Sequence, residues 1–333
     1  MTGVGPAIEA AGLTKRYGAT VALDDLALTV GRGEVFGFLG PNGAGKTTAV
    51  KLLLGLARPT GGGATVLGAP LGDRETRRRI GYLPELFRYQ PWLTAREVLG
   101  LHCELVRLER SARPAEIAAT LRTVGLAARA DSLVGTFSKG MQQRLGLGVA
   151  LLGSPDLVIL DEPTSALDPI GRLDVRRIIA GLGARGAAVF LDSHLLTKVE
   201  RVCDRVAILD RGRVVASGRI DALTAAGDLR IRVSDLPDDA LAGLRSFVHG
   251  DGSAPEGADA AETVRRGTAG ARPGAADVIR RTEDGIVLTG LDSDRVPDVV
   301  AAIVAAGGRV HAVEPVRVTL EDRFLDLVAA GRS

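Results

Sequence analysis

The sequence predicts an α/β fold with a parallel sheet at its core, followed by a small C-terminal α+β domain. Three apolar runs are typical of strands buried on both faces, as in helix-covered parallel sheets: Val35–Leu39, Leu157–Leu160 and Ala187–Leu191. Segments with helical spacing of apolar residues separate these runs, and parallel strands need such crossover connections. A glycine-rich turn, residues 40–48, follows the first run directly. Strand, glycine-rich turn and helix in this order point to the P-loop class.

Length and composition allow two domains and exclude several classes of protein. The chain has 333 residues, 46% of them hydrophobic, which is ample for buried cores. The formal net charge is +2, so the charge balance requires neither nucleic acid nor an anionic membrane surface. Cys103 and Cys203 lie far apart beside apolar neighbours, which favours buried free thiols over a disulfide. Because no apolar run approaches the roughly 20 residues of a membrane span and no secretory signal is evident, we expect a soluble cytoplasmic chain.

The N-terminal part predicts two or three strands with short turns, from the runs at 7–10, 21–23 and 26–30, ahead of the glycine-rich turn. That turn consists of Gly40, Pro41, Asn42, Gly43, Ala44, Gly45, Lys46, Thr47 and Thr48. Its compact residues let backbone N–H groups converge on a phosphate chain, Lys46 suits the β- and γ-phosphates, and the Thr47 hydroxyl suits Mg²⁺. We therefore expect a nucleoside triphosphate site here. Tyr17, on the loop upstream, either packs as an ordinary core residue or stacks on an adenine ring.

The next stretch predicts strands at 64–67 and 80–83 and a helical insertion over 94–124. Another helix opens at residues 137–144, with Ser138 placed as its N-cap. Ser138 either caps the helix only, or forms a second anion site with Gly140 and the free N–H groups. The pattern leaves both interpretations open.

Two carboxylates, Asp161 and Glu162, follow the buried run that ends at Leu160. Ligands collect at the carboxyl ends of strands in open α/β sheets, and an acidic pair there is costly without a cation or bound water. Asp161 suits the Mg²⁺ shell, and Glu162 suits a base that orients or deprotonates the water attacking the γ-phosphate. Capping ahead of Pro163 explains two adjacent acids poorly.

The strand at Ala187–Leu191 ends in Asp192-Ser193-His194. A lone His is usually structural, but at a strand's carboxyl end His194 can hydrogen-bond a γ-phosphate or the attacking water. Two more strands, 204–209 and 213–217, close a domain spanning residues 1–225. Residues 226–333 predict an accessory domain with strands, a helix near 296–306 and a flexible insertion at about 250–276. This region shows no catalytic constellation, so we expect it to serve binding or assembly.

The order of these motifs resembles the ATP-binding subunit of ABC transporters over about residues 1–225. The resemblance makes Tyr17 the adenine contact, residues 40–48 the Walker A loop, Asp161 and Glu162 the Walker B pair, and His194 the switch. It also assigns Glu85 to the Q-loop, Asp168 to the D-loop, and five residues to the signature: Ser138, Lys139, Gly140, Met141 and Gln142. It implies a parallel ATP-binding core with an antiparallel β portion and a helical subdomain, using ATP and Mg²⁺. Thr47, Asp161 and Glu85 are the expected metal-side residues.

The resemblance further implies a nucleotide sandwich of two copies, in which the helix start at Ser138 of one copy faces the phosphate loop of the other. Two departures stand out. Glu85 occupies the place of the family's usual Gln, which adds charge near Mg²⁺, and Lys139 and Met141 replace the usual second Gly and the Gln of the signature. The Ser and the following Gly survive, so these changes bear on coupling rather than on nucleotide binding.

The tail from Val313 to Leu325 resembles ATPase subunits of daunorubicin-resistance-type exporters. It implies an export ATPase bound to a separate transmembrane permease at the inner face of the membrane, with no nucleic acid as a partner. The alternative is a soluble ABC ATPase acting on ribosomes or nucleic acid; the single cassette and the lack of a basic tail disfavour it. The absence of Asn-Lys-x-Asp disfavours a guanine-specific protein, and intact Lys46, Asp161, Glu162 and His194 disfavour a degenerate scaffold.

Overall fold

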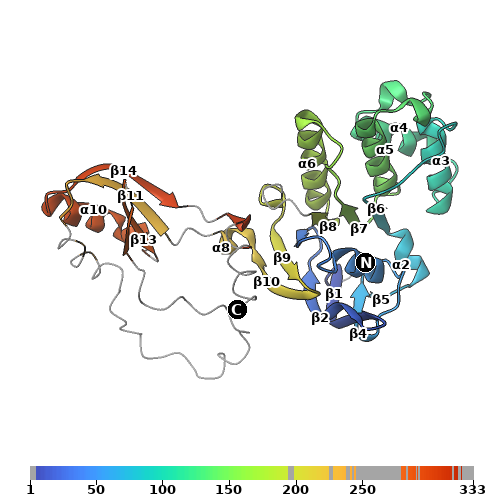
Figure 1. Ribbon diagram of the computed structural model, residues 1–333. Helices are drawn as coiled ribbons and strands as arrows, with labels where there is room; N and C mark the ends of the chain where they lie inside the picture. The colour runs from blue at the N-terminus through green and yellow to red at the C-terminus, as the bar shows by residue number, and fades with distance from the viewer. Residues whose placement is uncertain are drawn as a thin grey trace. The chain divides into compact units, whose positions relative to one another are not determined.

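The structure, a computed structural model, consists of two compact units (Figure 1). It describes residues 5–193, 199–224, 228–237, 241, 244, 279–282, 284–289, 291, 293–316, 319–321 and 324. The first unit comprises Met1–Leu223 with Leu320–Ser333, and the second comprises Thr224–Thr319. The sequence analysis placed the segment from Leu320 onward with the second domain, whereas its contacts lie in the first unit. The expected insertion at 250–276 lies outside the described residues.

A six-stranded sheet forms the centre of the first unit, in the order β10-β9-β3-β8-β7-β6. Its strands are β3 (Val35–Leu39), β6 (Ile80–Leu83), β7 (Leu157–Asp161), β8 (Ala188–Ser193), β9 (Arg205–Asp210) and β10 (Arg213–Arg219). The strands β9, β3, β8, β7 and β6 are parallel, and β10 pairs antiparallel with β9 at one edge. The predicted parallel core is therefore confirmed.

The two faces of this sheet bury separate hydrophobic cores, because successive side chains along a strand point to opposite faces. One core contains Phe36, Phe38 and Phe190, and the Phe36 and Phe190 rings stack with centroids 5.9 Å apart. The other contains Leu39, Leu160 and Leu191 and packs against the helices on that side. Continuous apolar runs thus arise because both faces are covered.

A second, antiparallel sheet in the order β2-β1-β4-β5 packs on the Phe36 side of the core. Its strands are β1 (Ile8–Tyr17), β2 (Thr20–Val30), β4 (Gly61–Val66) and β5 (Ala69–Pro70). Of the two or three strands expected ahead of the glycine-rich turn, the structure has two: the runs at 21–23 and 26–30 both belong to β2, which irregularities in its pairing with β1 bend without breaking. Tyr17 is likewise the last residue of β1 rather than part of a loop.

Among the helices of the first unit, α3 (Ala95–Leu105), α4 (Arg113–Thr123) and α5 (Lys139–Leu151) lie together as one group (Figure 1). The first unit also contains α1 (Lys46–Leu53), α2 (Arg74–Arg78), α6 (Pro169–Ala184) and α8 (Ile220–Leu223), with short 3₁₀ turns η1 (Ala127–Arg129) and η2 (Val134–Thr136). The three helices α3, α4 and α5 contact one another and form the predicted helical subdomain.

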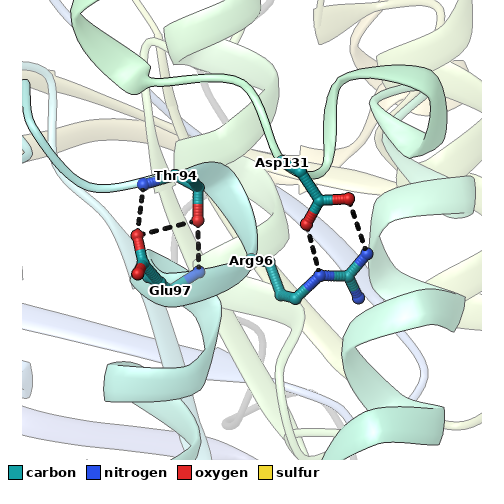
Figure 2. Close-up of polar contacts among 4 residues, drawn as sticks. All are labelled: Thr94, Arg96, Glu97 and Asp131. Carbon is teal, nitrogen blue, oxygen red and sulfur yellow. Dashed lines mark hydrogen bonds and ion pairs between the residues drawn. The ribbon is translucent and has the colours of Figure 1, made fainter.

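The start of α3 is held by two sets of side-chain contacts (Figure 2). Thr94 and Glu97 form a capping box: the Thr94 hydroxyl accepts from the Glu97 N–H, and the Glu97 carboxylate accepts from the Thr94 N–H at 2.8 Å. Arg96 makes a two-pronged ion pair with Asp131, at 2.7 and 3.2 Å. These contacts satisfy the N-terminus of α3 and tie it to the segment before η2.

The close packing of β6 against α5 leads to a stability prediction at Gly81. A Cβ on Gly81 would lie 1.8 Å from the carbonyl oxygen of Ala150, a backbone atom that cannot rotate away. We expect Gly81→Ala to lower the free energy of unfolding by about 3 kcal/mol, measured by urea denaturation. The control is Gly181→Ala in α6, where a Cβ meets nothing within 4 Å; a helical Gly→Ala change should be neutral or stabilising. Equal midpoints for the two variants would contradict the packing argument.

The second unit is an antiparallel sheet covered by one long helix among its described residues. The strand order is β12-β13-β11-β14, from β11 (Asp228–Ser234), β12 (Ile279–Thr282), β13 (Gly285–Thr289) and β14 (Arg309–Val316). The helix α10 (Val296–Ala305) follows the turn η3 (Ser293–Arg295) and buries Val299 and Ile303 against Ile231 and Ile286. This arrangement is an α+β domain, as expected for the C-terminal region.

Two further observations concern burial and hydropathy. Cys103 and Cys203 are free and buried, which confirms the prediction for both thiols. Leu320 is fully buried in the core of the first unit, where its N–H donates to the carboxylate of Glu200. Within the described residues, helices of the length and hydropathy needed to span a bilayer do not occur.

Candidate nucleotide-binding site

A polar cavity of about 260 Å³ lies where the glycine-rich turn meets the carboxyl ends of β7 and β8. Five segments of the first unit line it: Thr20, Val21, Ala22, Asn42, Gly43, Gly45, Lys46, Thr47, Thr48, Glu85, Asp161, Glu162 and Asp192. The structure therefore brings together most of the predicted phosphate loop, the predicted acidic pair and Glu85. It adds four residues that the sequence analysis missed, the start of β2 and Asp192.

The backbone of the phosphate loop, residues 40–48, packs closely against the start of β2 at Gly45. Gly45 has φ +108°, and a Cβ there would lie 2.3 Å from the carbonyl oxygen of Ala22. Gly45 is also the N-cap of α1, and no side chain caps this helix in the described structure. The first N–H groups of α1 and the positive end of its dipole thus meet the cavity, an arrangement suited to an anion.

Lys46 is the only cation among the residues that line the cavity in the described structure. Its ammonium donates to the carbonyl oxygens of Gly40 at 2.9 Å and Pro41 at 3.3 Å, and lies 3.9 Å from Asp192 Oδ1. Four carboxylates share the same cavity. Carboxyl groups therefore outnumber cationic side chains in this cavity. A metal ion that accompanies a phosphate chain supplies the missing positive charge.

Asp161 and Glu162 lie at the end of β7, both nearly fully buried. Glu162 has φ +47°, a left-handed conformation that is uncommon outside glycine, and its N–H donates to the carbonyl oxygen of Asp192. From α5, Gln143 donates to the Glu162 carbonyl oxygen at 3.4 Å. Two hydrogen bonds, one at the N–H and one at the carbonyl oxygen of Glu162, hold its backbone in this strained conformation. They thereby fix the point from which the Glu162 side chain extends.

Asp192 is the site residue that only the strand pairing reveals. The parallel register of β7 and β8 sets Asp192 beside Asp161. Burial raises the pKa of Asp192 to about 7, with Lys46 opposing and the neighbouring acids adding to the shift. Burial and the charge of Glu85 raise the pKa of Asp161 to about 6. Without a bound cation, these two carboxyl groups therefore retain protons into the neutral range as a coupled pair.

This pair predicts a pH dependence of stability in EDTA. Below about pH 4 the Asp192 carboxyl is protonated in the folded and the unfolded chain, so it contributes nothing. From about pH 4 to pH 7 the unfolded chain releases the proton while the folded chain retains it, so the free energy of unfolding falls as pH rises, and levels off above about pH 7. We expect Asp192→Asn to flatten this decline by up to about 4 kcal/mol over the full range.

The measurement compares urea unfolding of the wild type and of Asp192→Asn at about pH 5 and about pH 8, always in EDTA. Asp210→Asn, at the end of β9 and outside the cavity, is the matched control and should follow the wild type. An Asp192→Asn protein with the same pH slope as the wild type would contradict the assignment.

Other predicted site residues lie away from the cavity walls. Tyr17 is half exposed with Lys15 Nζ 4.8 Å from its ring centre, and pairs in β1–β2 with Thr20, which does line the cavity. Ser138 caps α5 by accepting from the Met141 N–H at 3.2 Å, and Asp168 caps α6 by accepting from the Gly171 N–H at 2.7 Å. His194 lies outside the described residues.

The residues present fit Mg²⁺ bound together with phosphates rather than a metal held by the protein alone. In the described part of the chain, no group of three or more His, Cys, Asp or Glu is placed to hold a metal. Mg²⁺ commonly uses one or two carboxylates plus substrate phosphates and waters. Thr47 and Asp161 line the same cavity, and Asp192 Oδ1 there is buried without a hydrogen bond in the described structure. A cation satisfies this surplus of negative charge.

The fold and this cavity define an α/β protein of the class that binds nucleoside triphosphates. Residues 23–165 match the family model described as ABC transporter. The chain is 48% identical over 206 residues to an uncharacterized ABC transporter ATP-binding protein of Nostoc sp., and 41% identical over 219 residues to the bacitracin transport ATP-binding protein BcrA of Bacillus licheniformis. These matches cover 61% of both chains in the first case, and 65% of this chain and 71% of BcrA in the second.

The chain belongs to the ABC transporter ATP-binding protein family. Its fold is similar to that in the dimeric post-hydrolysis structure of the ATP-binding cassette MJ0796 bound to ADP and Pi, with a TM-score of 0.59 and 25% identity over 64% of this chain and 98% of that one. The predicted P-loop ABC-type fold is thereby confirmed. The chain spans about three fifths of the length of the Nostoc relative.

Proposed function

We propose that this chain binds ATP with Mg²⁺, hydrolyses it, and thereby powers export of a substrate through a separate membrane permease. The observation that carries the proposal is the single cavity in which Lys46, the uncapped start of α1 and the buried Glu162 meet. Each group matches one requirement of phosphoryl transfer to water: a cation for the phosphates, convergent N–H donors, and a carboxylate base.

Binding begins with the phosphate chain against the phosphate loop. The N–H groups at the start of α1 donate to phosphate oxygens, and Lys46 exchanges its contacts with the Gly40 and Pro41 carbonyls for the β- and γ-phosphates. The Thr47 hydroxyl and Asp161 would hold Mg²⁺, which would supply positive charge beside the same phosphates. Tyr17, next to the cavity residue Thr20, serves as the stacking surface for adenine.

Hydrolysis uses Glu162 as the base. Its carboxylate accepts a proton from a water whose oxygen forms the new bond to the γ-phosphorus, while the bond from that phosphorus to the β,γ-bridging oxygen breaks and ADP leaves with the electron pair. The γ-phosphate departs as inorganic phosphate. His194 contacts the γ-phosphate or this water, and Glu85 lies on the metal side of the cavity.

A second copy of the chain completes the site. None of Ser138, Lys139, Gly140, Met141 and Gln142 lines the cavity of their own chain. At the start of α5, a Cβ added to Gly140 would lie 3.4 Å from the carbonyl oxygen of Ala166, in the segment leading to Asp168. A helix start with these residues meets a phosphate only across a head-to-tail pair, and the dimeric MJ0796 structure supports such pairing.

The permease contact is assigned to α3 and the segment before it. Leu86 and Trp92 are 87% and 69% exposed, and Leu101 and Leu105 on α3 are also exposed. Large apolar side chains in such numbers on one segment mark an interaction surface. The BcrA match and the resemblance of the C-terminal tail support export as the direction, and the inner face of the membrane as the place. The chain contacts the permease rather than the cargo.

The test has two parts. Tagged Glu162→Gln protein should elute as a dimer with ATP and Mg²⁺ and as a monomer without them, and Ser138→Arg should abolish this pairing while retaining ATP binding. From detergent-solubilised native membranes, the tagged chain should retain an integral membrane protein that a Leu101→Asp, Leu105→Asp variant loses. The proposal is refuted if the chain never forms a dimer in the presence of ATP and Mg²⁺. It is also refuted if the chain sediments with ribosomes and retains no membrane protein.

A further inference from the structure

A second cavity of about 280 Å³ lies across the central sheet from the nucleotide cavity. Its lining consists of Pro163, Thr164, Arg172, Arg176, Ile179, Leu191, Ser193, Arg201 and Val202. Leu191 packs in the core on the α6 side, whereas the next residue, Asp192, lines the nucleotide cavity. Alternation along β8 therefore separates the two cavities onto opposite faces of the same strand.

The charged side chains among the described lining residues of this second cavity are all positive. Three arginines line it, and no Asp or Glu is among the described lining residues. Arg172 uses its Nε to donate to the Leu167 carbonyl oxygen, which leaves the end of its guanidinium available. Arg176 and Arg201 have no ion pair or hydrogen bond within the described ranges. By contrast, the neighbouring Arg177 on α6 pairs with Asp174 at 3.6 Å.

The remaining walls are apolar with two hydroxyl groups. Ile179, Leu191 and Val202 form an apolar surface, and Thr164 and Ser193 add hydroxyls. Arg172 and Arg176 are only partly exposed, so their charges are screened less than those of free surface side chains. Clustered guanidinium groups beside an apolar wall are suited to an anion that carries an apolar substituent.

We propose that this cavity, between α6 and residues 201–202, binds a phosphate monoester. A monocarboxylate offsets one of three positive charges, whereas a phosphate monoester offsets nearly two and offers three oxygens to the planar forks of the arginines. Its ester substituent lies against Ile179, Leu191 and Val202. This site is separate from the nucleotide cavity and does not depend on the proposed transport function.

The test measures binding of hexyl phosphate by isothermal titration calorimetry to the full-length protein with MgADP present. Arg176→Gln and Arg201→Gln should each weaken binding about tenfold, and raising the salt concentration should weaken it further. Arg177→Gln is the matched control, one residue along the same helix and outside the cavity, and should bind as the wild type does. Hexanol, which lacks the anion, should not bind measurably.

Lys46→Ala separates the two cavities, because it should leave hexyl phosphate binding unchanged. Loss of hexyl phosphate binding in Lys46→Ala would place the ester in the nucleotide cavity and overturn the proposal. Equal affinities for hexyl phosphate in Arg176→Gln, Arg201→Gln and Arg177→Gln would also overturn it. So would the absence of saturable binding by the wild type. Vesicles containing phosphatidic acid identify the source of the ligand. Sedimentation that Arg176→Gln reduces supports a lipid headgroup, and hexyl phosphate binding without sedimentation supports a soluble ester.

Discussion

Glu162→Gln should lower ATP turnover by at least about a hundredfold while ATP binding stays within about twofold of the wild type. Gln matches the shape of Glu, but it cannot accept a proton from water. The side chain is nearly fully buried, and its backbone is held at φ +47° by the Asp192 carbonyl and Gln143. An isosteric replacement should therefore preserve the geometry and remove only the base.

Phosphate release measures turnover, and fluorescence of a labelled ATP analogue measures binding. Glu75→Gln is the control, because Glu75 lies exposed on α2 and pairs with Arg78 rather than with the cavity. The Glu162→Gln variant should also accumulate the ATP-bound dimer, because the dimer opens only after hydrolysis. Turnover equal to that of the wild type would remove Glu162 from the role of base.

Lys46→Ala should weaken ATP affinity by about a hundredfold, at the upper end of what a charged hydrogen-bond donor contributes. The reason is the charge balance of the cavity: Lys46 is its one cation in the described structure, against Glu85, Asp161, Glu162 and Asp192. Removing it deletes the contact to the phosphates and leaves the carboxylates to repel them. The loss should be largest when Mg²⁺ is limiting.

Titration of the labelled ATP analogue gives the affinity, and a melting curve shows that the variant is folded. Lys51→Ala serves as the control, because Lys51 lies in the last turn of the same helix and outside the cavity. Unchanged affinity in Lys46→Ala would argue against the phosphate-loop assignment.

The local parts of the fold and site were predictable from particular residues. The phosphate loop is readable because its glycines, Lys46 and Thr47 are contiguous, and one short backbone conformation uses them all. Asp161 and Glu162 could be predicted as site residues because they directly follow a continuous apolar run. Such a run is typical of a strand that is buried on both faces. The capping role of Ser138 follows from its place before a helical pattern, and the structure confirms it.

Other features could not be predicted, because they depend on which distant segments pair. Nothing near Asp192 in the chain marks it as a neighbour of Asp161; the register of β7 with β8 does. Thr20–Ala22 line the cavity from a different sheet, and no local pattern in the sequence marks the start of this strand as part of the site. Leu320 packs with residues far earlier in the chain, which reassigns the C-terminal segment to the first unit.

By itself the sequence determined the class of fold, the phosphate loop, the acidic pair and the membership of the family, because each is encoded in a short contiguous stretch. The tertiary structure decided how much negative charge surrounds Lys46, which face of β8 meets which cavity, and where the three arginines of the second cavity gather. The physical reason is that electrostatic energy depends on distances through space and on burial. Strand register and helix packing set both, over separations in the chain that local patterns do not span.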